Sequence, residues 1–508
     1  MTPSVHPWNR QWPCWCLGLL LASCSTPTAV RTSDEGVKLT SPRRPNQPNH
    51  PNYASVLIAD VPHVRQKPDF CGEAVTESWL KALGSSVSQD EVFALSGMNP
   101  ERGMGATTRE LAVALERLGF EVGPVFGKAS AESADDLEKQ FAALHADLLQ
   151  RIPSIVCMHY SDKPATTEHF RLVLGYDATT DEVVYHEPAA ANAAYQRMSR
   201  QQFLALWPLK YDPKLWTVIR LRLAGTPKGP TATTGTLATP TLIRTTQAEY
   251  AQHIMRLREG KGRGFNVILE PPFVVLGDGS STELRAVATR TVRWAVGHLK
   301  RDFFSKDPAR ILDIWLFRDA SSYESNVLRL FGSSPTTPYG YYSSEHDALV
   351  MNIATGGGTL VHEIVHPYIE ANFPDCPAWF NEGLGSLYEQ SAERDGHIIG
   401  LTNWRLAGLQ KRITRGKLAS FPTLLSTTTR QFYDDDSGGN YAQARYLLYY
   451  LQEKGLLVRY YREFFEHRAS DPTGLTTLKR VLDEPDIEAF QKRWETWVMR
   501  LQFPEGGP

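Results

Sequence analysis

The sequence predicts an α+β protein of two domains, the first with helices packed on an antiparallel sheet and the second with a small sheet and a mostly helical part. Three observations predict this fold class. The chain has 508 residues, 42% of them apolar and 22% charged, which fits a globular protein too long for one core. A Thr-, Pro- and Gly-rich stretch, residues 224–241, lies near the midpoint. Helical patterns precede strand patterns in the first half and dominate the end of the chain.

The charge balance limits the possible partners. The formal net charge is -2, so the chain has no excess of positive charge that would neutralise a phosphate backbone or bind an anionic membrane surface. Nucleic acid is therefore not an expected partner.

The first residues combine Arg10 with a short apolar run that ends in Leu21-Ala22-Ser23-Cys24. The run is too short to span a membrane and predicts a signal peptide, residues 1–23. Its end resembles the lipobox of bacterial lipoproteins, in which a cysteine after small residues is lipidated. The resemblance implies lipidation at Cys24 and a lipid anchor to the bacterial cell envelope, at the outer membrane on its periplasmic side or at the cell surface.

Six cysteines are spread over the chain. Cys14 and Cys16 would be removed with the signal peptide. Apart from the lipidated Cys24, the residues Cys71, Cys157 and Cys376 would remain. This odd, scattered set predicts no disulfide framework. We expect Cys157 to be a small core residue and Cys376 a loop thiol.

Composition also divides the chain. Residues 24–54 are rich in Pro and Asn and predict a tether. Residues 224–245 cannot bury enough apolar surface to order themselves and predict a linker. Two domains follow, residues 55–223 and 246–508.

In the first domain, residues 71–84 and 107–119 place apolar side chains at helical spacing, and each segment ends on a glycine. Residues 153–160, 169–177 and 181–188 are short β-branched and aromatic runs bounded by turn residues, which predicts strands. The order of these elements predicts helices followed by a sheet.

In the second domain, residues 265–278 and 310–317 predict strands, and residues 283–304 between them predict a helix. From Thr359 onward helical patterns dominate. The sheet therefore comes first and the helical part follows.

One predicted helix, Thr359–Asn372, carries the pattern HExxH. His362 and His366 are four residues apart and share one face, with Glu363 beside them. A catalytic zinc takes three protein ligands, and Glu382, on what we expect to be the next helix, can supply the third. Glu363 is placed to accept a proton from a water on the metal.

These residues, followed by the stretch P-A-W-F-N-E-G that contains Glu382, resemble the gluzincin metallopeptidases of the MA clan. The resemblance covers roughly residues 265–451. It implies Zn²⁺ on His362, His366 and Glu382, with Glu363 as the base. An oxyanion donor is also needed, and Tyr441 is preferred over Tyr341 and Tyr342, although a tyrosine in that segment is equally compatible with a core position.

Two residues depart from a simple version of this site. Pro367 lies inside the predicted helix, where it removes one backbone hydrogen bond and can bend the axis. Ser386 stands where thermolysin-type relatives carry an aspartate, which leaves the hydrogen-bond partner of the metal-binding histidines open.

The first domain contains a second candidate site. Cys71 opens a predicted helix, whose positive end is expected to lower the pKa of the thiol. His169 at a strand start can act as its base, and Glu187 at the end of the following strand can orient the imidazole. Gln66, five residues before the cysteine, can donate to an oxyanion.

This order of residues resembles the papain-like fold of the bacteriocin-processing cysteine peptidases, which cut after double-glycine leaders. The resemblance covers roughly residues 55–223. The relatives carry a shorter acid where this chain has Glu187, and the longer arm can orient or misplace the imidazole. Catalysis and a retired, peptide-binding version therefore both stay open.

Together these features predict an envelope-anchored peptidase that acts on a peptide or protein substrate. The alternative is a lipoprotein that binds peptides or peptidoglycan stems without cutting them.

Overall fold

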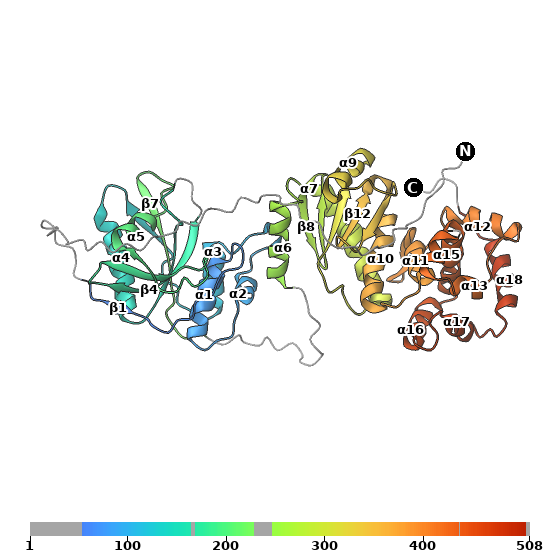
Figure 1. The fold of residues 1–508 in the computed structure, drawn as a ribbon, viewed down its shortest axis with the longest axis horizontal. Helices are drawn as coiled ribbons and strands as arrows, with labels where there is room; N and C mark the ends of the chain where they lie inside the picture. The colour runs from blue at the N-terminus through green and yellow to red at the C-terminus, as the bar shows by residue number, and fades with distance from the viewer. Residues whose placement is uncertain (1–52, 164–167, 228–245, 436, 504–508) are drawn as a thin grey trace, which may run out of the picture.

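The structure, a computed structural model, describes residues 53–163, 168–227, 246–435 and 437–503 (Figure 1). The predicted signal peptide, Cys24, almost all of the tether and most of the linker lie outside these residues. Figure 1 shows three parts in a row: a first domain in blue and green, a sheet with its helices in yellow, and a helical part in orange and red.

The first domain is built on one antiparallel sheet. Its strand order is β2-β7-β3-β4-β5-β6, and β1 pairs with β4. Alternation places apolar side chains of the central strands β3 and β4 in the core, where Ile155, Leu172 and Leu174 are fully buried. The strands are β1 (Val56–Leu57), β2 (Phe126–Ser130), β3 (Ser154–His159), β4 (Glu168–Asp177), β5 (Glu182–His186), β6 (Gln196–Ser199) and β7 (Leu215–Arg222).

Helices cover this sheet. The helix α1 begins at Cys71, and its buried residues Val75 and Leu80 join the core formed with the sheet. A capping box of Ser88 and Glu91 starts α2. The helices are α1 (Cys71–Ala82), α2 (Gln89–Ser96), the 3₁₀ turn η1 (Pro100–Arg102), α3 (Thr108–Arg117), α4 (Ala134–Leu149) and α5 (Arg200–Leu206).

The second domain begins with a five-stranded mixed sheet in the order β11-β12-β10-β9-β8. The central strand β10 runs parallel to β9 and β12, whereas β8 and β11 pair antiparallel at the two edges. Every residue of β9, β10 and β12 is buried, as expected for strands covered on both faces. The strands are β8 (Asn266–Glu270), β9 (Phe273–Gly277), β10 (Leu312–Phe317), β11 (Gly340–Ser343) and β12 (Ala348–Asn352).

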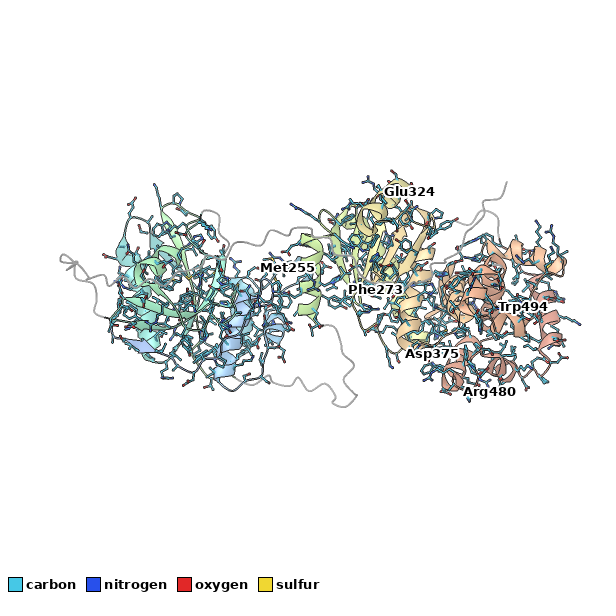
Figure 2. The ribbon with its side chains drawn as sticks, viewed as in Figure 1. Met255, Phe273, Glu324, Asp375, Arg480 and Trp494 are labelled. Carbon is cyan, nitrogen blue, oxygen red and sulfur yellow. The ribbon has the colours of Figure 1, made fainter. Side chains whose placement is uncertain are left out.

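Two apolar clusters, one on each side, cover this sheet. One face packs on α6 and α9 through Tyr250, Ile254 and Tyr323. The other face joins the large core of the helical part, which includes Phe273 on β9, labelled in Figure 2. The helices of this part are α6 (Gln247–Glu259), α7 (Ser281–Val287), the π-helical stretch η2 (Ala288–Arg293), α8 (Trp294–Asp302), α9 (Ala320–Phe331) and the 3₁₀ turn η3 (Ile353–Thr355).

The remainder of the chain is mostly helical. Its core contains Trp379 and Trp494, both fully buried. The elements are α10 (Gly358–Asn372), α11 (Ala378–Tyr388), the hairpin β13 (Ser391–Arg394) and β14 (His397–Gly400), α12 (Arg405–Thr414), α13 (Phe421–Leu425), α14 (Thr429–Asp434), α15 (Ser437–Glu453), α16 (Leu457–His467), α17 (Leu475–Leu482) and α18 (Ile487–Val498). None of the described helices combines the length and the apolar character that crossing a membrane requires.

The predicted fold class, α+β with an antiparallel sheet under helices and a mostly helical C-terminal part, is confirmed. The expected helix of residues 283–304 is present but is interrupted by the π-helical stretch η2. Short strands were missed, among them β11 and β12, because runs of four or five residues carry little periodicity.

Candidate active sites

The HExxH residues lie on α10, which packs against α11. Two glycines permit the close approach. A Cβ at Gly358 would lie 2.0 Å from the carbonyl oxygen of Glu389, and one at Gly385 would lie 3.0 Å from the imidazole of His362. Because neither position has a side chain, α11 can lie directly on the histidine face of α10.

The three predicted metal ligands come together at this contact. The ligand atoms of His362, His366 and Glu382 all lie within 4.8 Å of one another. The Oε2 atom of Glu382 is 3.1 Å from Nε2 of His362 and 3.9 Å from Nε2 of His366. Glu363 lies at the edge of this group, with its Oε2 atom 3.8 Å from Nε2 of His366.

The other nitrogen of each imidazole is held by a second side chain. Nδ1 of His362 lies 3.2 Å from Oε1 of Glu389, and Nδ1 of His366 lies 2.9 Å from Oδ1 of Asn381. An acceptor at Nδ1 would leave the lone pair of Nε2 for a metal ion. Both histidines therefore aim the same nitrogen at the carboxylate of Glu382.

Glu389 is itself fixed. Arg405 donates to both of its oxygens, at 2.7 and 3.0 Å, and Asn403 donates to Oε2 at 3.1 Å. Burial opposes ionisation, but the hydrogen bonds from His362 and Arg405 lower the pKa of Glu389. The carboxylate therefore stays charged although its side chain is only 7% exposed.

Charge and donor type fit a divalent metal. Burial raises the pKa of Glu363, whereas His366 and His362 lower the pKa of Glu382 despite its burial. The carboxylates of Glu382 and Glu389 thus lie on either side of the imidazole of His362, and Arg405 pairs with Glu389. Two imidazoles and one carboxylate with such outer partners are the donor set that zinc takes in catalytic sites.

A tyrosine that the sequence analysis missed contacts this group. The hydroxyl of Tyr433 donates to Oε1 of Glu382. Tyr441, the predicted oxyanion donor, lies beside it with ring centroids 6.3 Å apart, and burial followed by the charge of Glu382 raises the pKa of Tyr441. Both phenols therefore stay protonated and remain hydrogen-bond donors.

The alternative tyrosines lie on β11. The hydroxyl of Tyr342 donates to Oε2 of Glu370 at 3.3 Å, and burial raises the pKa of Tyr341. The backbone of Tyr342 hydrogen-bonds Glu363, which brings this edge strand against the HExxH helix.

Both departures noted in the sequence have a structural outcome. The helix α10 continues through Pro367 from Gly358 to Asn372. Ser386 is fully buried, and its hydroxyl has no hydrogen-bond partner among the described residues. Glu389, three residues further on, occupies the position next to Nδ1 of His362. No sequence signal other than its being one turn away pointed to it.

In the first domain, Cys71 is the first residue of α1 and lies against the start of β4. Its sulfur takes a backbone hydrogen bond from Phe170, the residue after His169. Across the sheet, Oε1 of Glu187 lies 2.5 Å from Nε2 of His169. This leaves Nδ1 as the imidazole nitrogen not used by Glu187. No hydrogen bond joins Cys71 and His169 among the described residues.

Glu187 is shared with Arg171, whose Nε donates to Oε2 at 2.8 Å. Burial works against ionisation, but His169 and Arg171 lower the pKa of Glu187. The glutamate therefore reaches the imidazole despite its extra methylene, and Arg171 fixes its second oxygen. Arg171 was not predicted, because only its place two residues after His169 on the same face of β4 connects it to the site.

The expected effect of the helix end on Cys71 is wrong. Cys71 is 9% exposed, and burial raises the pKa of its thiol to about 12, with the nearby Glu73 and Asp69 adding to the shift. Loss of solvation therefore outweighs the helix dipole, which acts over about one turn.

Two polar groups near Cys71 lack partners. Oε1 of Gln66 and Oε2 of Glu73 are buried and have no hydrogen-bond partner among the described residues. Oε1 of Glu73 accepts from the backbone of Ala106 at 2.7 Å, and burial raises the pKa of Glu73 to about 8.

Comparison with known proteins bears on the first domain. Residues 58–212 match the sequence model described as the Peptidase_C39 like family, so this part of the chain is similar to that family. The peptidase domain of Streptococcus ComA, a bifunctional ABC transporter involved in a quorum-sensing pathway, is 23% identical; the match covers 31% of this chain and 95% of that one, with a TM-score of 0.21. No protein of curated function matches. The family match favours the cysteine type of peptidase for residues 58–212 and leaves the second domain unassigned.

Proposed function

We propose that this protein is a peptidase of the bacterial cell envelope with two sites, a zinc site at His362, His366 and Glu382 and a thiol site at Cys71. The observation that supports the zinc site best is the convergence of the three ligand atoms within 4.8 Å. Its support is strengthened by Glu389 and Asn381, which hold both Nδ1 atoms.

Zn²⁺ bound there would polarise a scissile carbonyl and would lower the pKa of its bound water to near neutrality. Glu363, beside the ligands, would accept the proton of the attacking water and pass it to the leaving amine. The phenol of Tyr441 would donate to the oxygen on which negative charge develops. Glu382 would be kept in place by the hydrogen bond from Tyr433.

The substrate of this site would be an extended peptide. Among the described strands, β11 is at the edge of its sheet and pairs with β12 alone, and it lies against α10. An edge strand offers unpaired backbone groups to which a peptide can add as a further strand. Such a peptide would pass Glu363.

At the thiol site, Cys71 would attack the scissile carbonyl carbon while His169 accepts the thiol proton. The imidazolium would then protonate the leaving amine as the carbon–nitrogen bond breaks, and water would hydrolyse the resulting thioester. Glu187 would hold the imidazole, and Gln66 would donate its amide to the oxyanion.

The first test measures cleavage of a fluorogenic peptide library by the full chain. Glu363→Gln should keep its metal and lose zinc-dependent activity by about 100-fold or more. Glu324→Gln on α9, labelled in Figure 2, changes an equivalent carboxylate far from the site and should retain activity. Full activity of Glu363→Gln would refute the zinc mechanism.

One observation favours the alternative of a peptide-binding protein without thiol catalysis: the thiol of Cys71 is buried, with its pKa raised. In that case Cys71→Ser would leave all cleavage unchanged and would still bind the library peptides. A loss of chelator-resistant cleavage in Cys71→Ser would instead establish a working cysteine peptidase.

The envelope location is also a proposal, supported by the lipobox-like sequence before Cys24. Metabolic labelling with a palmitate analogue should mark the wild-type chain, and Cys24→Ala should lose the label. Equal labelling of both would contradict the lipid anchor.

A further inference from the structure

We infer that α6 of the second domain positions the turn that presents Gln66 and Cys71, with Gln252 as the positioning residue. This inference rests on the proposed thiol site. It connects the two domains through one side chain.

The nucleophile follows directly on a tight turn. Phe70 donates its backbone N–H to the carbonyl of Lys67 at 3.0 Å, which defines a four-residue β-turn. Pro68 occupies its second position, and Asp69, with a φ of 61°, occupies the third. This combination defines a type II turn, in which the third residue must adopt a left-handed conformation. Asp69 is not glycine, so the turn depends on contacts from outside.

One of these contacts comes from α6. Nε2 of Gln252 donates to the carbonyl oxygen of Pro68 at 2.7 Å, across 184 residues of sequence. This carbonyl belongs to the central peptide of the turn, whose orientation distinguishes a type II from a type I turn. Gln252 is 6% exposed, so water cannot readily replace its amide.

Hydrogen bonds within the first domain supply further contacts. Gly105 donates to Oδ2 of Asp69 at 2.9 Å, Lys67 donates its N–H to Oε1 of Gln89 at 2.8 Å, and Gln66 donates its N–H to Pro188 at 2.9 Å. All these partners lie within the first domain. Gln252 therefore supplies the hydrogen bond by which the second domain holds the central peptide of the turn.

Apolar packing holds α6 in place beside the turn. Ala248 and Ala251 form one cluster with Phe70, Phe93 and Met98, all at most 3% exposed. Phe70 is the N-cap residue of α1 and stacks on Phe93 with ring centroids 5.0 Å apart. Because both residues on α6 are alanines, the helix backbone can lie close to the residue that precedes Cys71.

The opposite face of α6 belongs to the second domain. Tyr250 and Ile254 pack with Val274 and Leu276 of β9. Figure 1 shows α6 between the first domain and β8, and Figure 2 labels its buried residue Met255 there. The helix is therefore fixed to the sheet of the second domain and docks on the first.

The turn has room to move once the hydrogen bond is removed. Pro68 and Gln252 line a cavity of about 620 Å³ that also contacts His253, Arg310 and Asp347 of the second domain. A turn that swings toward this cavity would carry Phe70 and Cys71 with it. Loss of the Gln252 contact should therefore expose the thiol and disturb its alignment with His169.

The test compares iodoacetamide labelling of Cys71 in the full-length chain, with each cysteine followed by peptide mass spectrometry. Gln252→Leu removes the donor at nearly the same volume and should speed the labelling of Cys71 about 2- to 10-fold, the range expected for one lost hydrogen bond. Labelling of Cys157, 1% exposed on β3, should not change. This readout needs no peptidase activity.

The matched control is Arg258→Ala on the same helix. Arg258 donates to the carbonyls of Arg102 and Glu101 at 2.9 and 2.8 Å and so joins the domains without touching the turn. In Arg258→Ala, Cys71 should be labelled at the wild-type rate. Wild-type labelling in Gln252→Leu, or the same acceleration in both variants, would overturn the positioning role.

Labelling of Cys157 in Gln252→Leu as well would show that this variant has unfolded. Gln252→Asn is then used instead, because its shorter side chain withdraws the amide from Pro68 by one methylene. Cys71 should again be labelled faster in Gln252→Asn than in the wild type or in Arg258→Ala. In a chain with thiol peptidase activity, Gln252→Leu should lower kcat more than it raises KM. Absence of thiol peptidase activity in the wild-type chain would refute the proposed thiol catalysis. It would leave the role of Gln252 untouched, because that role is decided by the labelling rates.

Discussion

The two candidate sites treat burial in opposite ways. In the second domain, the two imidazoles and the carboxylate of Glu382 have partners: Glu389 and Asn381 hold the histidines, and Tyr433 holds Glu382. In the first domain, Cys71 and Glu73 are buried with incomplete pairing, and burial raises the pKa of both groups. Burial therefore organises a polar site when every group has a partner and suppresses ionisation when it does not.

Glu187 is the well-paired group of the first site, so its replacement should cause the largest loss of stability. Glu187→Ala leaves Arg171, 4% exposed, without its carboxylate, and removal of one partner of a buried ion pair costs about 3–5 kcal/mol. Denaturant unfolding of the full chain, followed through labelling of Cys157, should show this loss. Glu187→Gln, which keeps one acceptor, should lose clearly less; equal losses would contradict the pairing.

Glu73 should make the stability of the first domain depend on pH. Its pKa is raised from 4.5 to about 8 by burial, so the folded chain keeps a proton that the unfolded chain loses. The stabilisation is fully present below pH 4.5 and is lost as the pH rises toward 8, by an amount on the order of a few kcal/mol. Between pH 5 and 8, wild-type stability should fall relative to that of Glu73→Gln.

The same unfolding experiment measures this difference at the two pH values. Glu116→Gln, an exposed change on α3, serves as the control and should follow the wild type. A constant difference between wild type and Glu73→Gln at both pH values would show that Glu73 is not protonated in the folded chain.

In the second domain, Glu389→Gln should weaken metal binding about 10- to 100-fold, the usual effect of altering a group that holds a metal ligand. The amide cannot accept from Arg405 at both atoms as the carboxylate does. Competition with a fluorescent zinc chelator measures the affinity, with Glu393→Gln on β13 as a charge-matched control. Equal affinities would exclude Glu389 from the site.

Asn381→Ala is expected to have the smallest effect, a loss of metal affinity up to about 10-fold. His366 keeps its place through α10 after Nδ1 loses its partner, and its side chain is more exposed than that of His362. A larger loss of metal affinity in Asn381→Ala than in Glu389→Gln would contradict the expectation that the partner of His362 matters more than the partner of His366.

The local spacing of residues in the sequence predicted much of this architecture. Helical spacing predicts that His362 and His366 share a face, and a short connection predicts that Glu382 returns to it; the structure brings these residues together. Likewise Cys71 opens a helix, and Glu187 meets His169. The roles of these residues stay predictions.

What local pattern could not supply was the set of partners. Tyr433 reaches Glu382 from 51 residues away, and Gln252 reaches Pro68 from 184 residues away. Neither pair has a spacing that marks it, because such contacts arise only when separate helices pack. The pKa of Cys71 was missed for the same reason: the helix end is visible in sequence, but the burial that outweighs it is not.

The most direct measurement of the central claim is the metal content of the purified full-length chain after dialysis against zinc, compared with Glu382→Gln. We expect about one zinc per wild-type chain, as for a three-ligand catalytic site, a rise in melting temperature on zinc addition, and far less bound metal in Glu382→Gln. A wild-type chain that holds no divalent metal and melts at the same temperature with and without zinc would contradict the account.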